Sequence, residues 1–158
     1  MKKILPVAVL SALAGVNAAQ ATQVSSDGLG QVLLYPFYTA EGGQDTLINL
    51  VNTTGEYKAV KVRILESMNS QEVLDFNLYL SPYDHWSAVI TADTDGEGAT
   101  LTSADTSCTV PNGVSDGDTI DFRTFEYDGS RAGSREDSES GFDRTREGYV
   151  EVIEMGTV

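Results

Sequence analysis

The sequence predicts an all-β fold, and three observations lead to that prediction. From residue 22 onward, apolar residues recur with a period of two instead of the 3.6 of an amphipathic helix. The apolar runs are short, and Gly, Asn, Asp and Pro residues separate them. About seven or eight short strands of this kind are typical of an antiparallel β-sandwich, either immunoglobulin-like or jelly-roll-like, here with long acidic loops.

The first two predicted strands cover residues 30–38 and 46–53. Pro36 interrupts the first strand, which suits a sheet edge or a bend because proline donates no backbone hydrogen bond. Gly42 and Gly43 supply the turn that joins the two strands.

The next two predicted strands show the clearest alternation. In residues 57–66, Val60, Val62 and Ile64 share one face, and the basic residues between them point to the other face. Residues 72–80 alternate in the same way, up to the turn that follows. Both strands are therefore expected to have one buried and one wet face.

The remaining predicted strands are residues 85–91, 99–102, 119–127 and 149–155. In the first of them, Trp86, Ala88 and Ile90 share one side, which leaves His85 on the opposite, wetter side. The polar residues 128–146 separate the last two strands. Because this segment has almost no apolar side chains to bury, we expect a mobile loop or an insertion there.

Residues 1–21 have the pattern of a secretory signal peptide. Lys2 and Lys3 precede a short apolar run, and small residues around Ala19 and Ala21 are typical of a cleavage site. The apolar run is too short to span a bilayer comfortably. We therefore expect an exported protein, secreted or on the cell surface, with no transmembrane segment in the mature chain.

The chain of 158 residues is strongly acidic. It has 24 acidic and 10 basic residues, and its net charge is −14. Loss of residues 1–21 would leave eight basic residues against 24 acidic ones, a net charge of −16. Such a surface repels phosphate groups, so we expect no nucleic-acid partner. Acidic surfaces keep exported proteins soluble and also attract divalent cations.

Cys108 is the only cysteine in the sequence. In an oxidising compartment, an odd cysteine is typical of a free thiol, an intermolecular disulfide or a missing partner. The last predicted strand also ends close to Val158. We expect residues 22–158 to form one β-sandwich domain, which is either complete or truncated at its C-terminus.

One acidic segment has the residue types of a calcium loop. Asp93, Asp95 and Glu97 alternate with Thr94 and Gly96. Carboxylates spaced in this way direct several oxygens at one cation, and calcium takes about six to eight oxygen ligands. The bidentate glutamate expected further along is absent, and Asp and Gly are also ordinary turn residues. We predict calcium ligation by the two aspartates and the glutamate, with an ordinary turn as the alternative.

No catalytic residues are predicted. His85 is the only histidine and Asp84 is next to it, but the sequence has no Gly-x-Ser-x-Gly nucleophile motif, and a zinc site needs more His and Cys ligands. Tyr79, Tyr83 and Trp86 would stack on sugars if they formed an exposed row. A secreted carbohydrate-binding module, with a glycan of the outer-membrane surface as its ligand, is therefore the alternative function.

Six segments spread between Gly28 and Met155 carry a resemblance to a known family. They are GQVLLYPFYT, DTLINLVNTT, KAVKVRILE, EVLDFNLYLSPYDHW, TSCTVP and DRTREGYVEVIEMG. Together they resemble a family of exported cell-surface proteins of Gram-negative, largely marine bacteria, which includes surface-layer proteins. Its members are longer, which implies that this chain is an N-terminal fragment and that Cys108 has a partner further on.

The resemblance implies a cell-surface structural protein in which calcium joins acidic faces, and it transfers no catalytic residues. With the residue-level analysis, it leads to a secreted, non-enzymatic protein of the cell surface that self-assembles like a surface layer. Exposed edge strands would provide the association surface. A secreted hydrolase ranks below both this function and carbohydrate binding.

Overall fold

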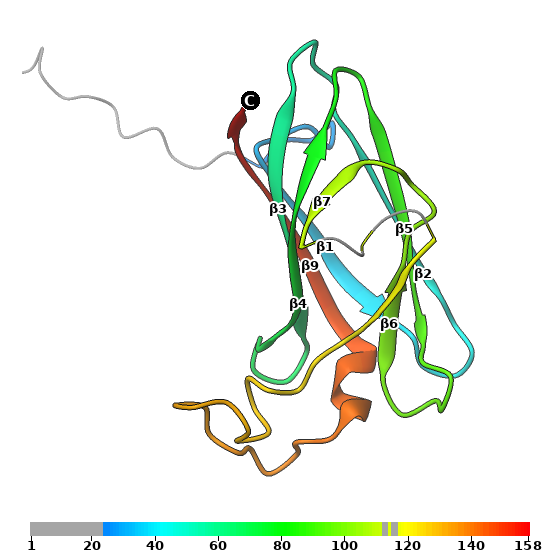
Figure 1. Ribbon diagram of the computed structural model, residues 1–158, viewed down its shortest axis with the longest axis vertical. Coiled ribbons are helices and arrows are strands. Elements are labelled where there is room, and N and C mark those ends of the chain that lie inside the picture. Colours follow the sequence, from blue (N-terminus) through cyan, green and yellow to red (C-terminus); the bar gives the residue numbers. More distant parts are fainter. Residues whose placement is uncertain (1–23, 112–113, 115–116) are drawn as a thin grey trace, which may run out of the picture.

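The computed structural model describes residues 24–111, 114 and 117–158. They form two antiparallel sheets packed face to face, so the predicted all-β sandwich is confirmed (Figure 1). The signal peptide predicted in residues 1–21 lies outside the described residues. Within the described ranges, the structure contains no helix with the length and apolar character needed to cross a membrane.

The larger sheet has five strands in the order β1-β9-β3-β4-β7. These strands are β1 (Val32–Thr39), β9 (Glu147–Thr157), β3 (Lys58–Glu66), β4 (Glu72–Leu80) and β7 (Cys108–Val110). The last strand of the chain, β9, therefore lies between β1 and β3, and β1 and β7 form the two edges of this sheet.

The smaller sheet has four strands in the order β2-β5-β6-β8. These strands are β2 (Thr46–Val51), β5 (His85–Ala92), β6 (Ala99–Thr102) and β8 (Thr119–Asp121). A 3₁₀-helix, η1 (Phe142–Arg146), leads into β9. The edge strands β1 and β2 lie on the same side of the sandwich, because the Tyr35 hydroxyl donates a 2.6 Å hydrogen bond to the Asn49 carbonyl oxygen.

The core lies between the sheets and follows the predicted alternation. Val62 and Ile64 of β3, Phe76 of β4, and Trp86 and Ile90 of β5 are all completely buried. The ring centroids of Trp86 and Phe76 lie 5.8 Å apart across the two sheets. Burying each side chain of this size stabilises the fold by about 1.5–3 kcal/mol, so the alternation alone accounts for much of the sandwich.

The predicted strand over residues 119–127 is shorter in the structure and ends at Asp121. The reason lies in the backbone hydrogen bonds of the next two residues. The N–H of Phe122 donates to Ala99 of β6, whereas the N–H of Arg123 donates to Val73 of β4. The chain therefore crosses from one sheet to the other at this point, and it cannot continue as a strand of either.

Candidate functional site

The predicted calcium ligands lie in the loop that joins β5 to β6. Both oxygens of the Asp93 carboxylate accept backbone hydrogen bonds within this loop, from the N–H groups of Glu97 and Gly98, each at 2.9 Å. Gly96 has a φ of 72°, the left-handed conformation that this turn requires. The side chains of Asp95 and Glu97 are exposed. Asp93 thus closes the turn, as in the alternative of an ordinary turn.

The three carboxylates do not surround a common point. Among residues 24–111, 114 and 117–158, no group of three or more Asp, Glu, His and Cys side chains is arranged to hold a metal. For a cation to bind, Asp95 and Glu97 would have to turn toward Asp93, whose oxygens already have amide donors. Calcium ligation by Asp93, Asp95 and Glu97 stays a prediction.

The aromatic row expected for a carbohydrate-binding surface is wrong for Trp86, which is fully buried against Phe76. Tyr79 is half-buried in β4, and Tyr83, 72% exposed, lies in the loop between β4 and β5. The periodicity of β5 had already placed Trp86 on the core side, opposite His85. A row that includes Trp86 is therefore incompatible with the alternation that builds the sheet.

His85 and Cys108 are both exposed. His85 Nε2 lies 3.3 Å from the Asn49 side-chain oxygen. Cys108 is a free thiol in the described part of the chain, on the edge strand β7 opposite Tyr79. Among the described residues, neither side chain is hydrogen-bonded to a carboxylate or an imidazole of the kind that activates a base or a nucleophile.

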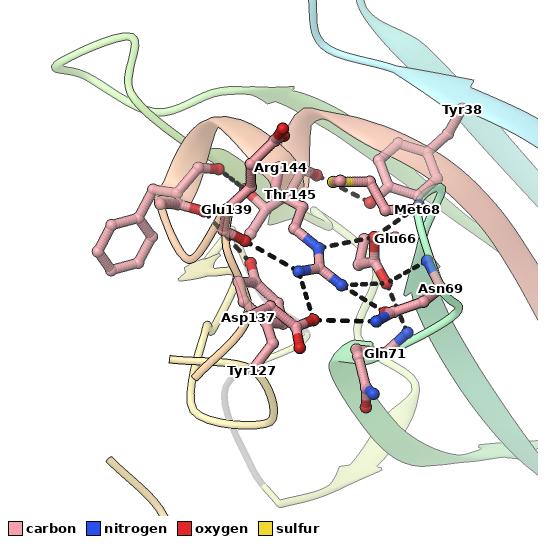
Figure 2. A network of polar contacts seen from close by, with 12 residues as sticks. Tyr38, Glu66, Met68, Asn69, Gln71, Tyr127, Asp137, Glu139, Arg144 and Thr145 are labelled. Atoms are coloured by element: carbon pink, nitrogen blue, oxygen red, sulfur yellow. Dashed lines mark hydrogen bonds and ion pairs between the residues drawn. The ribbon is translucent and has the colours of Figure 1, made fainter. Parts of the chain in front are cut away.

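A buried ion pair, absent from the sequence-based predictions, joins β3 to η1 (Figure 2). Glu66 is the last residue of β3, and Arg144 lies in η1. Arg144 Nε donates to Glu66 Oε2 at 2.9 Å, and Arg144 Nη2 donates to Glu66 Oε1 at 3.1 Å. The two side chains are 0% and 2% exposed. Such a two-point, charge-assisted contact fixes both orientation and distance.

Three backbone N–H groups complete the surroundings of the Glu66 carboxylate. They belong to Met68, Asn69 and Gln71, at 2.7, 3.2 and 2.6 Å. Burial by itself would raise the pKa of Glu66, but the Arg144 guanidinium and these amide donors together hold the pKa below its usual range. Arg144 and the three N–H groups occupy every acceptor position of the Glu66 carboxylate. The carboxylate therefore has no free lone pair for proton transfer, and its role is structural.

The other side of Arg144 holds the polar segment that precedes β9. Its Nη1 donates to the Asp137 carboxylate at 2.8 Å and to the Glu139 carbonyl oxygen at 2.9 Å. Its guanidinium lies 4.1 Å from the ring centroid of the buried Tyr127. The lack of apolar side chains in residues 128–146 predicts a mobile loop or an insertion; the contacts of Arg144 with Asp137 and Glu139 attach part of this segment to the sandwich.

The two edge strands β1 and β2, which together we name the β1–β2 edge, expose large apolar side chains. These are Val32, Leu34 and Phe37 of β1, on the outer face of the larger sheet, and Leu47 and Val51 of β2, on the outer face of the smaller sheet, all between 52% and 75% exposed. Neither strand contains a charged residue, although 22% of the chain is charged. Edge strands usually carry charges that discourage pairing, so this surface is suited to contact with another apolar surface.

The β1–β2 edge, the Glu66–Arg144 pair and the acidic turn are thus the distinctive features of the described structure. No family model, curated protein or solved structure matches the chain.

Proposed function

We propose that this chain is an exported, non-enzymatic structural protein of the cell surface that self-associates through the β1–β2 edge. The observation that supports the proposal is the contrast between this edge and the rest of the molecule. The chain has a net charge of −14, yet two adjoining edge strands lack charge and expose large apolar side chains. Exposed apolar side chains on uncharged edge strands are typical of an interaction site.

Electrostatics favours self-association at this edge over other places on the molecule. Two copies with the same net negative charge repel each other over most orientations. Contact between two β1–β2 edges brings uncharged strands together and buries apolar area. Because added salt screens the residual repulsion, the association should strengthen with ionic strength.

Placing a negative charge on the edge should disrupt the association. In Leu34→Glu, the affinity between copies is expected to fall about tenfold or more, because like charges facing each other across an interface cost several kcal/mol. Sedimentation velocity over a concentration series measures this change. The matched control is Val110→Glu, which introduces the same charge at a 49% exposed position on the opposite edge strand, β7.

Equal effects of Leu34→Glu and Val110→Glu would contradict the proposed surface. A protein that is monomeric at all concentrations and salt levels would contradict self-association itself. If that monomer were retained on immobilised outer-membrane glycan, the carbohydrate-binding alternative would replace the proposal.

Calcium is part of the proposed function as the ion that joins acidic faces. We expect calcium to increase assembly, seen as ordered sheets by negative-stain electron microscopy, and a chelator to disperse them. The double variant Asp95→Asn/Glu97→Gln should weaken this response and leave Asp93 to close the turn. The control is Asp45→Asn, an exposed aspartate in the turn between β1 and β2. Assemblies indifferent to the chelator would contradict a role for calcium.

A further inference from the structure

The backbone of β1 presents hydrogen-bonding groups on its outer side. The carbonyl oxygen of Gln31 accepts a 2.7 Å hydrogen bond from the N–H of Glu154 in β9, so residue 31 faces β9. Successive strand residues direct their N–H and C=O groups to opposite sides. Leu33 therefore also faces β9, whereas Val32 and Leu34 direct both groups away from it. Among the described strands, β9 is the one neighbour of β1.

The other three edge strands are less suited to pairing. At β2, the Tyr35 hydroxyl already donates to the Asn49 carbonyl oxygen in the middle of the strand. The edge strands β7 and β8 have three residues each, and β8 ends on the exposed Asp121. The outer side of β1 is therefore the most available edge in the described structure.

Alternation restricts how a second β1 can pair with the first. Residues directly opposite each other in antiparallel strands point to the same face, so the outward Val32 and Leu34 must meet outward residues of the second copy. Because the N–H and C=O groups of Val32 and Leu34 point toward the second copy, these two residues must also be the ones that form the hydrogen-bonded pairs. Both conditions are met for Val32 and Leu34 at the same time, each with an apolar partner, when Val32 lies opposite Leu34 of the second copy.

We propose that two copies of this chain join through β1, antiparallel, around a two-fold axis that passes beside Leu33. This proposal rests on the proposed self-association and names the strand and the register that produce it. Each of the two Val32–Leu34 pairs exchanges two N–H···O bonds and places two apolar side chains in contact. The two five-stranded sheets become one continuous sheet, and the contact is the same patch on both copies, as a two-fold dimer requires.

Pro36 limits how far the ladder extends along β1. Residue 36 has the same parity as Val32 and Leu34, so its nitrogen is directed toward the outer side, where proline has no hydrogen to donate. The β1–β9 register also shifts between Tyr35 and Tyr38. Pairing therefore stops at Tyr35. A slip toward Pro36 would replace a bonded pair with one that lacks a donor, and a slip the other way would place Leu34 opposite Gly30, which precedes β1 and has no apolar side chain.

Disulfide trapping tests the register directly. Leu33 faces Leu33 of the second copy in a pair that is not hydrogen-bonded, the closer of the two pair types in antiparallel sheets. In a Cys108→Ser background, Leu33→Cys is expected to form a disulfide-linked dimer as the main species on a non-reducing gel after mild oxidation. The matched control is Leu47→Cys in the same background, on β2 of the same edge and 75% exposed. This variant should run as a monomer on the same gel, because Leu47 does not face Leu47 of the second copy.

The outcomes separate this proposal from the proposed function. If the wild-type protein self-associates but Leu33→Cys gives no dimer, or if Leu47→Cys cross-links equally well, pairing through β1 is overturned and self-association stands. If the wild-type protein does not self-associate, both are overturned. Should Leu33→Cys not fold, the double variant Val32→Cys/Leu34→Cys tests the same register from two exposed positions, and absence of a dimer there overturns the pairing.

Discussion

Replacing Glu66 with glutamine is expected to lower the free energy of unfolding at pH 7 by about 3–5 kcal/mol. The substitution keeps the size of the side chain but removes its charge, so the guanidinium of Arg144 loses its buried counter-ion and keeps only the carboxylate of Asp137, which is 32% exposed. Urea denaturation followed by circular dichroism measures the loss. The control is Glu72→Gln, whose carboxylate pairs with Arg63 at the surface and whose loss should cost less than about 1 kcal/mol.

The pH dependence of this loss separates charge from packing. The pKa of Glu66 in the folded protein is lower than that of a free glutamate, about 4.3. The pair therefore stabilises the fold fully above that value, and this stabilisation is lost as the pH falls through the folded-state pKa. The difference between wild type and Glu66→Gln should thus shrink on acidification. A difference that stays constant into strong acid would contradict an electrostatic role.

Replacing Gly148 with alanine is expected to cost about 3 kcal/mol or more, because the new methyl group has no room. Gly148 lies in β9, where it pairs with β1 and with β3. A Cβ atom there would overlap the Leu65 carbonyl oxygen and lie 2.8 Å from Tyr38 Cε1 and 2.9 Å from Glu66 Cα. Two of these neighbours are backbone atoms of the central ladder, which cannot withdraw without breaking it.

The control for this substitution is Gly55→Ala. Its nearest neighbour would be the hydroxyl of Tyr83, 3.3 Å away on an exposed side chain that can turn aside. We expect a change within about 0.5 kcal/mol for this surface position. Thermal unfolding of both variants makes the comparison, and equal midpoints would show that β9 tolerates a side chain at Gly148.

The sandwich could be predicted from the sequence because its long strands alternate strictly. The predicted strands 72–80 and 99–102 coincide with β4 and β6. The three-residue strand β7 was missed, since three residues are too few for a period of two to be recognised. The end of β8 was missed for a different reason: the crossing between sheets depends on hydrogen bonds to β4 and β6, which are remote in sequence.

One member of the buried ion pair, Glu66, could be predicted from the sequence, and its partner could not. Glu66 has the same parity as Val60, Val62 and Ile64, so the alternation of β3 places a carboxylate on the core side. A buried carboxylate requires a cationic partner, because an unpaired buried charge is costly. Nothing local identifies that partner as Arg144, since the two residues are 78 positions apart. The acidic turn differs, because its residue types fit a calcium loop as well as an ordinary turn. Composition alone does not show that the Asp93 carboxylate accepts hydrogen bonds from backbone N–H groups of the same loop.

The position of β9 in the middle of the larger sheet determines when the protein can fold. The Tyr38 hydroxyl finds its acceptor, the Thr145 carbonyl oxygen, 107 residues further along the chain. Until residues 147–157 have been synthesised, β1 lacks its partner strand in the larger sheet and β3 lacks one of its two partners. Sheets that depend on such distant pairing form slowly, because the entropy of closing the loop is lost before the stabilising contacts form. A nascent chain therefore cannot complete its larger sheet before β9 has emerged from the ribosome.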